Sequence, residues 1–283
     1  MLTTQDRKYL EMLIANDALI DSDIIPLDDG DAYSSDYTGG STKMNDRGYP
    51  LRWGRIIHRV KKSVGLEEVG SDCVIATVTR TIDGIMKISA PYQLSTRMRN
   101  TMISKPFIEN SVRKARFMRV GESVDPSRNW KLNGVSIVHG GTKSANVSIS
   151  EFELRTQSGD TISLRSPDEP TWPFRVNGLG HFATVGGETD LDVRVKVQTS
   201  EVEPNMVVLR SGYKGKWGQR TLLPLKIESR IGDQYIHTYE NTVRAQPRPG
   251  VFHAVVEAIS RESLCDRDAP VLTRFWGIPY TVQ

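Results

Sequence analysis

The five histidines of this chain show none of the spacings that bind metal ions in proteins. His-x-His, His-x-Glu and His-Glu-x-x-His arrangements set ligands on one side of a strand or helix, and none occurs here. His237 and His253 fall in predicted strands, where packing between strands is a simpler explanation than metal binding. No glycine-rich phosphate loop and no Gly-x-Ser-x-Gly motif opens a helix. The sequence therefore predicts no metal site, no cofactor and no catalytic residue.

A pair of carboxylates that hydrolyses a glycoside would leave no motif, because two such residues meet only in the folded chain. Asp266 and Asp268 precede Ala269-Pro270, which is typical of a turn in which Asp side chains bind nearby backbone groups. Exposed aromatic residues could serve as platforms for a sugar, and the candidates are Trp172, Tyr213, Trp217 and Trp276. A β-sandwich carbohydrate-active hydrolase or binding module therefore stays as an alternative.

Basic residues gather in two short segments and are the most informative charged feature. Apolar residues in segment 51–64 recur at i, i+3, i+4, i+7 and i+11, the spacing of one face of an amphipathic helix. A second helix is expected over 106–119. The candidate anion-binding or nucleic-acid-binding residues are Arg52, Arg55, Arg59, Lys61 and Lys62 in the first segment and Arg113, Lys114, Arg116 and Arg119 in the second.

Two explanations of these basic helices remain open. If their basic faces point the same way, they form a positive surface suited to nucleic-acid phosphates or an anionic membrane. The simpler alternative is a pair of solvated helix faces, or docking to the acidic residues 17–36 of the same or a neighbouring chain. No helix-turn-helix spacing is recognisable, so sequence-specific DNA binding is not predicted.

Other elements of the first half follow from apolar spacing and turn residues. Segment 4–20 predicts a short amphipathic helix with Thr4 as the N-cap. The β-branched run from Val74 to Ile82, followed by Asp83-Gly84 and a second apolar run to Ile88, predicts a β-hairpin. Pro91 is expected to begin another helix.

Charge is distributed unevenly along the 283 residues, although the net charge is only +3. Residues 1–45 carry nine acidic and three basic residues, whereas residues 46–128 carry eight acidic and sixteen basic residues. Segments of opposite charge usually have different partners, or bind one another. We expect three regions: an acidic helix with a flexible linker over 1–45, a basic α+β region over 46–128, and a β-sandwich domain over 129–283.

The C-terminal half is expected to form an antiparallel β-sandwich. Leu191, Val193, Val195 and Val197 alternate with polar residues, as in a half-buried strand, and turn residues recur about every dozen positions. The apolar alternation slips near Ser150-Glu151, which predicts a β-bulge there. Immunoglobulin-like and jelly-roll layouts bury the same alternate positions, so the sequence leaves both open.

Two cysteines, Cys73 and Cys265, are too few for a disulfide framework and fit a reducing compartment, or a virion assembled in the cytoplasm. Whether they pair stays open. No apolar run is long enough to cross a membrane, and no signal peptide is visible.

Together these features favour a non-catalytic structural or assembly protein, such as a virion, tail or surface component, which associates with itself or with other proteins. Nucleic-acid binding through residues 51–64 and 106–119 is the first alternative, and the carbohydrate-active class is the second.

Overall fold

The computed structural model describes residues 2–17, 20, 52–94, 97–157, 159, 161–167, 174–175, 183–213 and 216–283. These residues form a mainly β structure with few helices, as predicted. The helical segments are α1 (Thr4–Asn16), the 3-10 turn η2 (Pro126–Arg128) and α4 (Arg261–Cys265). The strands are β1 (Arg52–Glu68), β2 (Cys73–Leu94), β3 (Arg97–Arg119), β4 (Trp130–Val135), β5 (Val138–Thr142), β6 (Val147–Thr156), β7 (Thr161–Leu164), β8 (Phe174–Arg175), β9 (Ala183–Val185), β10 (Asp190–Thr199), β11 (Met206–Tyr213), β12 (Lys216–Leu222), β13 (Leu225–Ile231), β14 (Gln234–Arg244), β15 (Gly250–Ile259) and β16 (Thr273–Val282).

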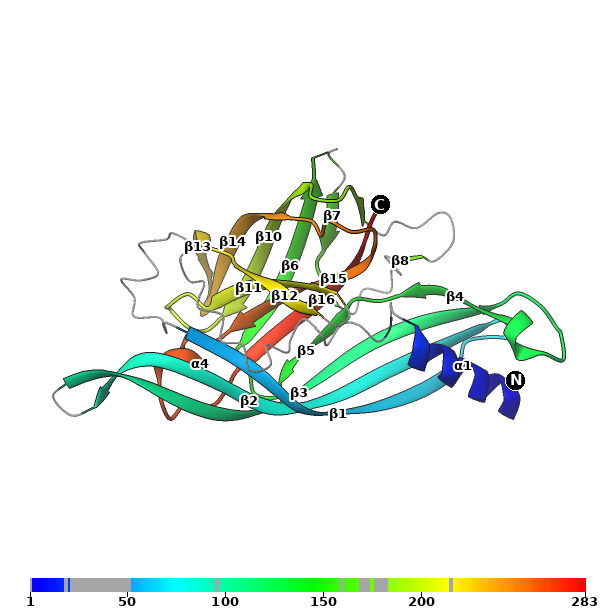
Figure 1. The fold of residues 1–283 in the computed structure, drawn as a ribbon, viewed down its shortest axis with the longest axis horizontal. Helices are drawn as coiled ribbons and strands as arrows, with labels where there is room; N and C mark the ends of the chain where they lie inside the picture. The colour runs from blue at the N-terminus through cyan, green and yellow to red at the C-terminus, as the bar shows by residue number, and fades with distance from the viewer. Residues whose placement is uncertain are drawn as a thin grey trace.

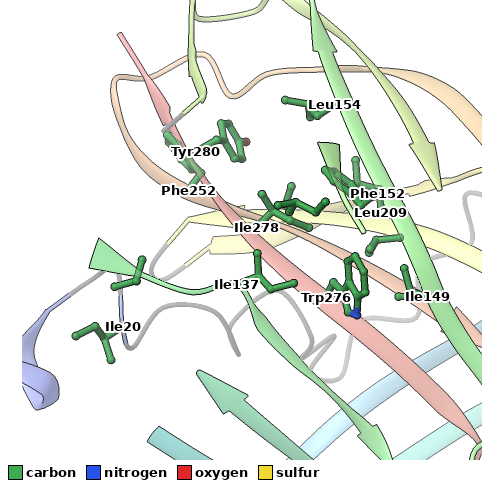
Figure 2. Close-up of a cluster of buried hydrophobic side chains, with 14 of the residues drawn as sticks. Ile20, Ile137, Ile149, Phe152, Leu154, Leu209, Phe252, Trp276, Ile278 and Tyr280 are labelled. Carbon is green, nitrogen blue, oxygen red and sulfur yellow. The ribbon is translucent and has the colours of Figure 1, made fainter. Parts of the chain in front are cut away.

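The strands form two sheets that pack face to face in the C-terminal half (Figure 1). The smaller sheet has the order β13-β14-β10-β6-β7, and the main path of the larger sheet is β1-β2-β3-β5-β16-β15-β11-β12. Figure 2 shows the core between them, where Phe152 and Leu154 of β6 lie near Leu209, Trp276 and Ile278 of the larger sheet. Apolar side chains that alternate along each strand therefore fill one shared core.

Strand β10 has the predicted alternation, because Leu191, Val193, Val195 and Val197 are all buried. The predicted bulge is confirmed as well. Lys196 pairs with Glu151 while the next residue, Val197, pairs with Ile149, so Ser150 is the extra residue in β6. The bulge lets Phe152 and Ile149, which lie an odd number of residues apart, both reach the core.

The first half contains three very long strands, β1, β2 and β3, which we call the ribbon. They pair antiparallel with one another over most of their lengths, and β3 also pairs with β5 of the larger sheet. In Figure 1 the ribbon runs along the bottom of the molecule, with the sandwich above it and α1 at its right end. The basic region and the sandwich thus share one continuous sheet.

The helices predicted over 51–64 and 106–119, and the one expected from Pro91, are wrong, because the described residues of these segments form strands. The predicted hairpin at Asp83-Gly84 is also wrong, since β2 continues through both residues. Gly84 lies opposite Ile57 in mid-strand, where a Cβ would overlap the Ile56 carbonyl oxygen and press on the Phe107 ring. Close approach of a neighbouring strand, and not a turn, explains this glycine.

The ribbon has two faces that differ in burial. On the inner face, which lies toward the sandwich and α1, alternate residues of β2 from Val74 to Ile88 are buried. The outer face carries the intervening residues, such as Thr79, which are half-buried or exposed. In β1 the pairing with β2 sets the same two faces, and an extra residue, His58, shifts the register between Ile57 and Arg59. Beyond this point the inner-face residues of β1 are less buried, and Val60 is 41% exposed.

Helix α1 packs on the inner face at one end of the ribbon. Leu10 and Ile14 are fully buried against Val78 and Phe117, and Lys62 of β1 donates a hydrogen bond to the Ile14 carbonyl. The helix begins at Thr4 and its N-cap is Thr3, one residue before the predicted cap. The core at this end is continuous with that of the sandwich.

Asp6 fastens the start of α1 to β4. Its carboxylate accepts hydrogen bonds from the Thr3 backbone and hydroxyl groups and from Trp130 Nε1 at 2.8 Å. Arg119 lies 4.0 Å away and stacks over the Trp130 ring. Burial alone would raise the pKa of Asp6, but the hydrogen bonds from Thr3 and Trp130, with the charge of Arg119, lower it below its ordinary value.

We expect Asp6→Asn to destabilise the protein at neutral pH by about 1–2 kcal/mol, through loss of the capping box and of the bond to a buried indole. Because the folded pKa is lowered, this stabilisation is present above the unfolded pKa of about 3.9 and is lost as the pH falls through the folded value. Thermal melts over a pH series should show a Tm gap to wild type that narrows in acid. Glu11→Gln, on the exposed side of the same helix, is the control. A gap that does not change with pH would contradict this role of Asp6.

The larger sheet curls so that its first and last strands come together. Arg220 of β12 donates a 2.9 Å hydrogen bond to the carbonyl of Trp53 in β1, and its guanidinium lies 4.1 Å from the Trp53 ring centroid. The space enclosed by the curled sheet contains a second buried apolar cluster, which includes Ile82, Phe107 and Val255. Among the described residues, no helix is long and apolar enough to span a membrane.

Candidate functional site

The predicted basic residues of β1 do not form one surface. Arg55 is fully buried inside the curled sheet, whereas Arg59 and Lys61 point to the outer face and are exposed. Lys62 points to the inner face, toward α1. Only the backbone of Arg52, which opens the strand, is described. A strand sends successive side chains to opposite faces, so neighbours that a helix would group are separated.

The basic residues of β3 are divided in the same way. Arg113 is fully buried, and Arg119 contacts Asp6 and Trp130 on the inner face. Lys114 is exposed on the outer face, and Arg116 is half-buried there with a hydrogen bond from its Nε to Asn133. The candidates that the fold brings to one face are therefore Arg59, Lys61, Lys114 and Arg116.

A network of buried charges holds the inside of the curled sheet together. Arg55 donates to Glu109 of β3 through one terminal nitrogen and to Glu257 of β15 through the other. Glu257 also accepts a 2.9 Å hydrogen bond from Arg210 of β11, and Glu109 accepts one from Thr273 of β16. All five side chains are buried. The network links five strands, β1, β3, β11, β15 and β16.

Aromatic rings line the same network. The guanidinium of Arg55 lies 4.4 Å from the centroid of the Phe107 ring, and Arg210 lies 5.1 Å from that of Trp53. Stacking on a ring face satisfies part of a guanidinium's surface where water is excluded. These rings therefore lower the cost of burying two arginines.

Arg113 and His253 make a further buried polar contact, with Arg113 Nη1 3.1 Å from His253 Nε2. A guanidinium can only donate, so His253 Nε2 accepts and the imidazole proton lies on Nδ1. This explains His253 as a packed residue of β15, in agreement with the interpretation that its strand position favoured. His237 lies in the neighbouring part of the sandwich, between Tyr235 and Tyr239.

Lys105 closes one end of the curled sheet. Its ammonium donates to the backbone carbonyls of Ser263, Asp266 and Ala269, in and after α4. Burial lowers the pKa of Lys105, and the nearby carboxylates of Asp266 and Asp268 offset part of this effect. The predicted turn is confirmed, because the Asp266 carboxylate accepts from the Asp268 backbone at 2.9 Å. Lys105 thus holds the loop that follows α4 against the ribbon.

The two cysteines are not joined in a disulfide. Cys73 opens β2, whereas Cys265 ends α4 and packs near Lys105, which pairs with Met86 far along β2. Burial raises the pKa of the Cys265 thiol, an effect that the positive charges of Arg261 and Lys105 partly oppose. A raised pKa keeps the less reactive thiol form.

The outer side of the smaller sheet carries a lattice of alternating charges around a hollow of about 410 Å³. Arg194 of β10 lies directly opposite Glu153 of β6 and Glu240 of β14. Its Nε donates to Glu240 at 2.6 Å, which raises the pKa of Arg194, and Arg155 donates to Glu153 at 3.1 Å. Arginines of the same sheet therefore engage Glu153 and Glu240, and the Asp192 carboxylate accepts a hydrogen bond from the Thr242 hydroxyl at 2.7 Å.

Three carboxylates, those of Glu153, Asp192 and Glu240, line this hollow. Besides these and the two arginines, its lining groups are Val193, Pro224, Lys226, Asn241 and Thr242, and none is aromatic. Trp276, a predicted sugar platform, is buried in the core. Trp172 and the side chains of Tyr213 and Trp217 lie outside the described residues. Within the described chain, no group of three His, Cys, Asp or Glu side chains could hold a metal ion.

The buried network itself was not predicted from the sequence. Glu257 interrupts the apolar run Val255-Val256-Glu257-Ala258-Ile259 at a core position, which is a signal for a buried carboxylate that needs a cationic partner. Glu109 alternates with Phe107 and Ser111 on the buried face of β3 in the same way. Alternation read as a strand would have singled out both residues.

Comparison with known proteins found no matching family model, no matching curated protein and no matching solved structure.

Proposed function

We propose that this chain is a non-catalytic structural protein that works by associating with other protein subunits, including copies of itself. The observation that carries the proposal is the ribbon. Its strands β2 and β3 contain 22 and 23 residues, and their outer face is turned away from the sandwich and α1. Strands of this length offer a large surface that the core of the chain does not use.

The buried charge network supports the same proposal. Its arginines and carboxylates bind one another across β1, β3, β11, β15 and β16, which fixes the ribbon relative to the sandwich. Buried ion pairs add little net stability, but unpaired arrangements of the same charges are strongly disfavoured, so such networks select one geometry. A fixed orientation of the ribbon relative to the sandwich suits a subunit whose surface must match that of its neighbours.

The nucleic-acid alternative has less support. Two of its nine candidate residues, Arg55 and Arg113, are buried, and Lys62 and Arg119 face α1. The four that share the outer face are accompanied there by Asp83, which pairs with Arg59 at 2.7 Å. Among the described residues, the carbohydrate alternative is supported only by the hollow on the smaller sheet, where arginines engage Glu153 and Glu240 and Thr242 engages Asp192.

The test is light scattering coupled to size-exclusion chromatography at low and high salt, with and without a random oligonucleotide. We expect a mass that is a multiple of the monomer, increases with protein concentration, and is unchanged by the oligonucleotide. A strict monomer at every concentration would contradict the proposal. A monomer that binds the oligonucleotide only at low salt would favour nucleic-acid binding.

A further inference from the structure

The outer face of the ribbon combines positive charge with exposed apolar residues. We define this face by the described side chains of β1, β2 and β3 that point away from the sandwich. Its charged residues are Arg59, Lys61, Glu67, Asp83, Lys87, Lys114 and Arg116, five basic and two acidic. The helices that contact the ribbon lie on the other side, α1 through Lys62 and α4 through Lys105.

Apolar residues lie between these charges. Ile56, Ile85 and Pro106 are direct neighbours across the three strands, and Ile108 beside them is 62% exposed. Lys61 and Lys114, further along the ribbon, are exposed as well. A partner that covers this face must therefore offer both carboxylates and branched apolar side chains.

We propose that the outer face of the ribbon is bound by the acidic segment 21–36 of a second copy of this chain, an inference that rests on the proposed function. Within this segment, which lies outside the described residues, the sequence has six Asp and no Lys or Arg. It also contains Ile24, Ile25 and Leu27 between the acidic positions. This one segment therefore contains both the carboxylates and the branched apolar side chains that the outer face requires.

The dimensions agree with this assignment. At a rise of about 3.3 Å per residue, the sixteen residues from 21 to 36 span roughly 53 Å when extended, and the equal run from Arg52 to Glu67 in β1 spans the same distance. Three strands about 4.8 Å apart make this face roughly 14 Å wide. Its area of roughly 750 Å² is close to the 800 Å² that each partner buries in an ordinary interface.

A second copy fits better than the same chain or a nucleic acid. Ile20, the last described residue before the segment, is buried on the inner face, where its carbonyl accepts a 2.7 Å hydrogen bond from Arg80. The residue that precedes the segment therefore lies on the side of its own ribbon opposite to the outer face. Phosphate groups would not bind against Ile56, Ile85 and Ile108, and Asp83 and Glu67 would repel them.

The experiment measures self-association of the full-length chain by sedimentation equilibrium. Lys61→Glu combined with Lys114→Glu reverses charge on the outer face without touching the core, and we expect the dissociation constant to rise at least tenfold. Lys143→Glu, an exposed lysine in the turn after β5, is the control for a change in net charge. Circular dichroism and melting should show that all variants fold alike.

A charge exchange makes the test specific for the segment. A chain with Asp28→Lys, Asp29→Lys and Asp31→Lys should bind the Lys61→Glu, Lys114→Glu chain in a mixture, although each associates poorly alone. If wild type self-associates and the double variant does so equally well, the inference fails while the proposed function stands. A monomeric wild type overturns both. Oligonucleotide binding that the double variant alone loses, with self-association unchanged, would assign the face to nucleic acid and overturn the inference.

Discussion

Replacing Arg55 with methionine is expected to lower the free energy of unfolding by about 3–5 kcal/mol, the cost of removing one partner from a buried ion pair. Arg55 is fully buried and bridges Glu109 and Glu257. Without it, Glu109 keeps the hydrogen bond from the Thr273 hydroxyl but loses its buried cationic partner, and Glu257 keeps Arg210. Methionine fills a similar volume, so the loss reports on charge and not on a cavity. Urea unfolding at neutral pH measures it.

The matched control is Arg59→Met, four residues along the same strand. Arg59 also pairs with a carboxylate, Asp83, but its side chain is 61% exposed. Exposed pairs contribute about 0–1 kcal/mol, so this variant should unfold almost like wild type. Removing Glu109 as well, in Arg55→Met with Glu109→Met, should recover much of the loss because an apolar pair replaces the ion pair. Equal stability of Arg55→Met and Arg59→Met would show that the network is not an important constraint.

The second large effect is expected at Gly141, where alanine should cost roughly 2–5 kcal/mol through backbone strain and overpacking. The φ angle of Gly141 is +146°, a conformation that residues with a side chain rarely adopt. An added Cβ would overlap the carbonyl oxygen of Thr273 and lie 3.0 Å from the Cα of Arg274. Strand β5, which contains Gly141, joins β3 to β16, so the strain falls where the ribbon meets the sandwich.

Gly65→Ala provides the comparison for this effect. Gly65 lies in β1, and a Cβ there would have no heavy atom within 4 Å. Alanine should therefore be neutral or stabilising, because it reduces the backbone entropy of the unfolded chain. Chemical unfolding of both variants, followed by circular dichroism, gives the two free energies. A Gly141→Ala protein as stable as Gly65→Ala would mean that β5 can move away from β16 at little cost.

The C-terminal strands were predictable because the alternation of buried and exposed residues is visible within each short stretch of sequence. Leu191 to Val197 alternate between a packed face and a solvent face, and this period of two needs no knowledge of the neighbours. The Ser150 bulge was predictable for the same reason, since only an extra residue reconciles the two apolar phases of β6. The first helix was predictable from its own apolar spacing, although its N-cap is Thr3 and not Thr4.

The ribbon was not predictable by the same method, and the bulge at His58 explains why. Trp53, Ile57, Val60 and Val64 have the spacing of a helical face, yet all four pair with inner-face residues of β2. Inner-face residues of a strand are normally two positions apart, but the extra residue His58 places Ile57 and Val60 three positions apart. The apolar spacing of a strand with a bulge therefore resembles that of a helix. The hydrogen bonds to β2 decide that this segment is a strand and not a helix. Because β2 is a separate part of the chain, the sequence of β1 alone does not reveal this pairing.

The sequence by itself determined the mainly β architecture, the alternating core of the sandwich and the separation of an acidic from a basic region. Only the tertiary structure decided which basic residues face solvent. Arg55 and Lys61 are alike in charge and lie in one strand, but Arg55 meets Glu257, which is 202 positions away. Burying a guanidinium is tolerable only where such a partner is already in place, and no local pattern carries that information.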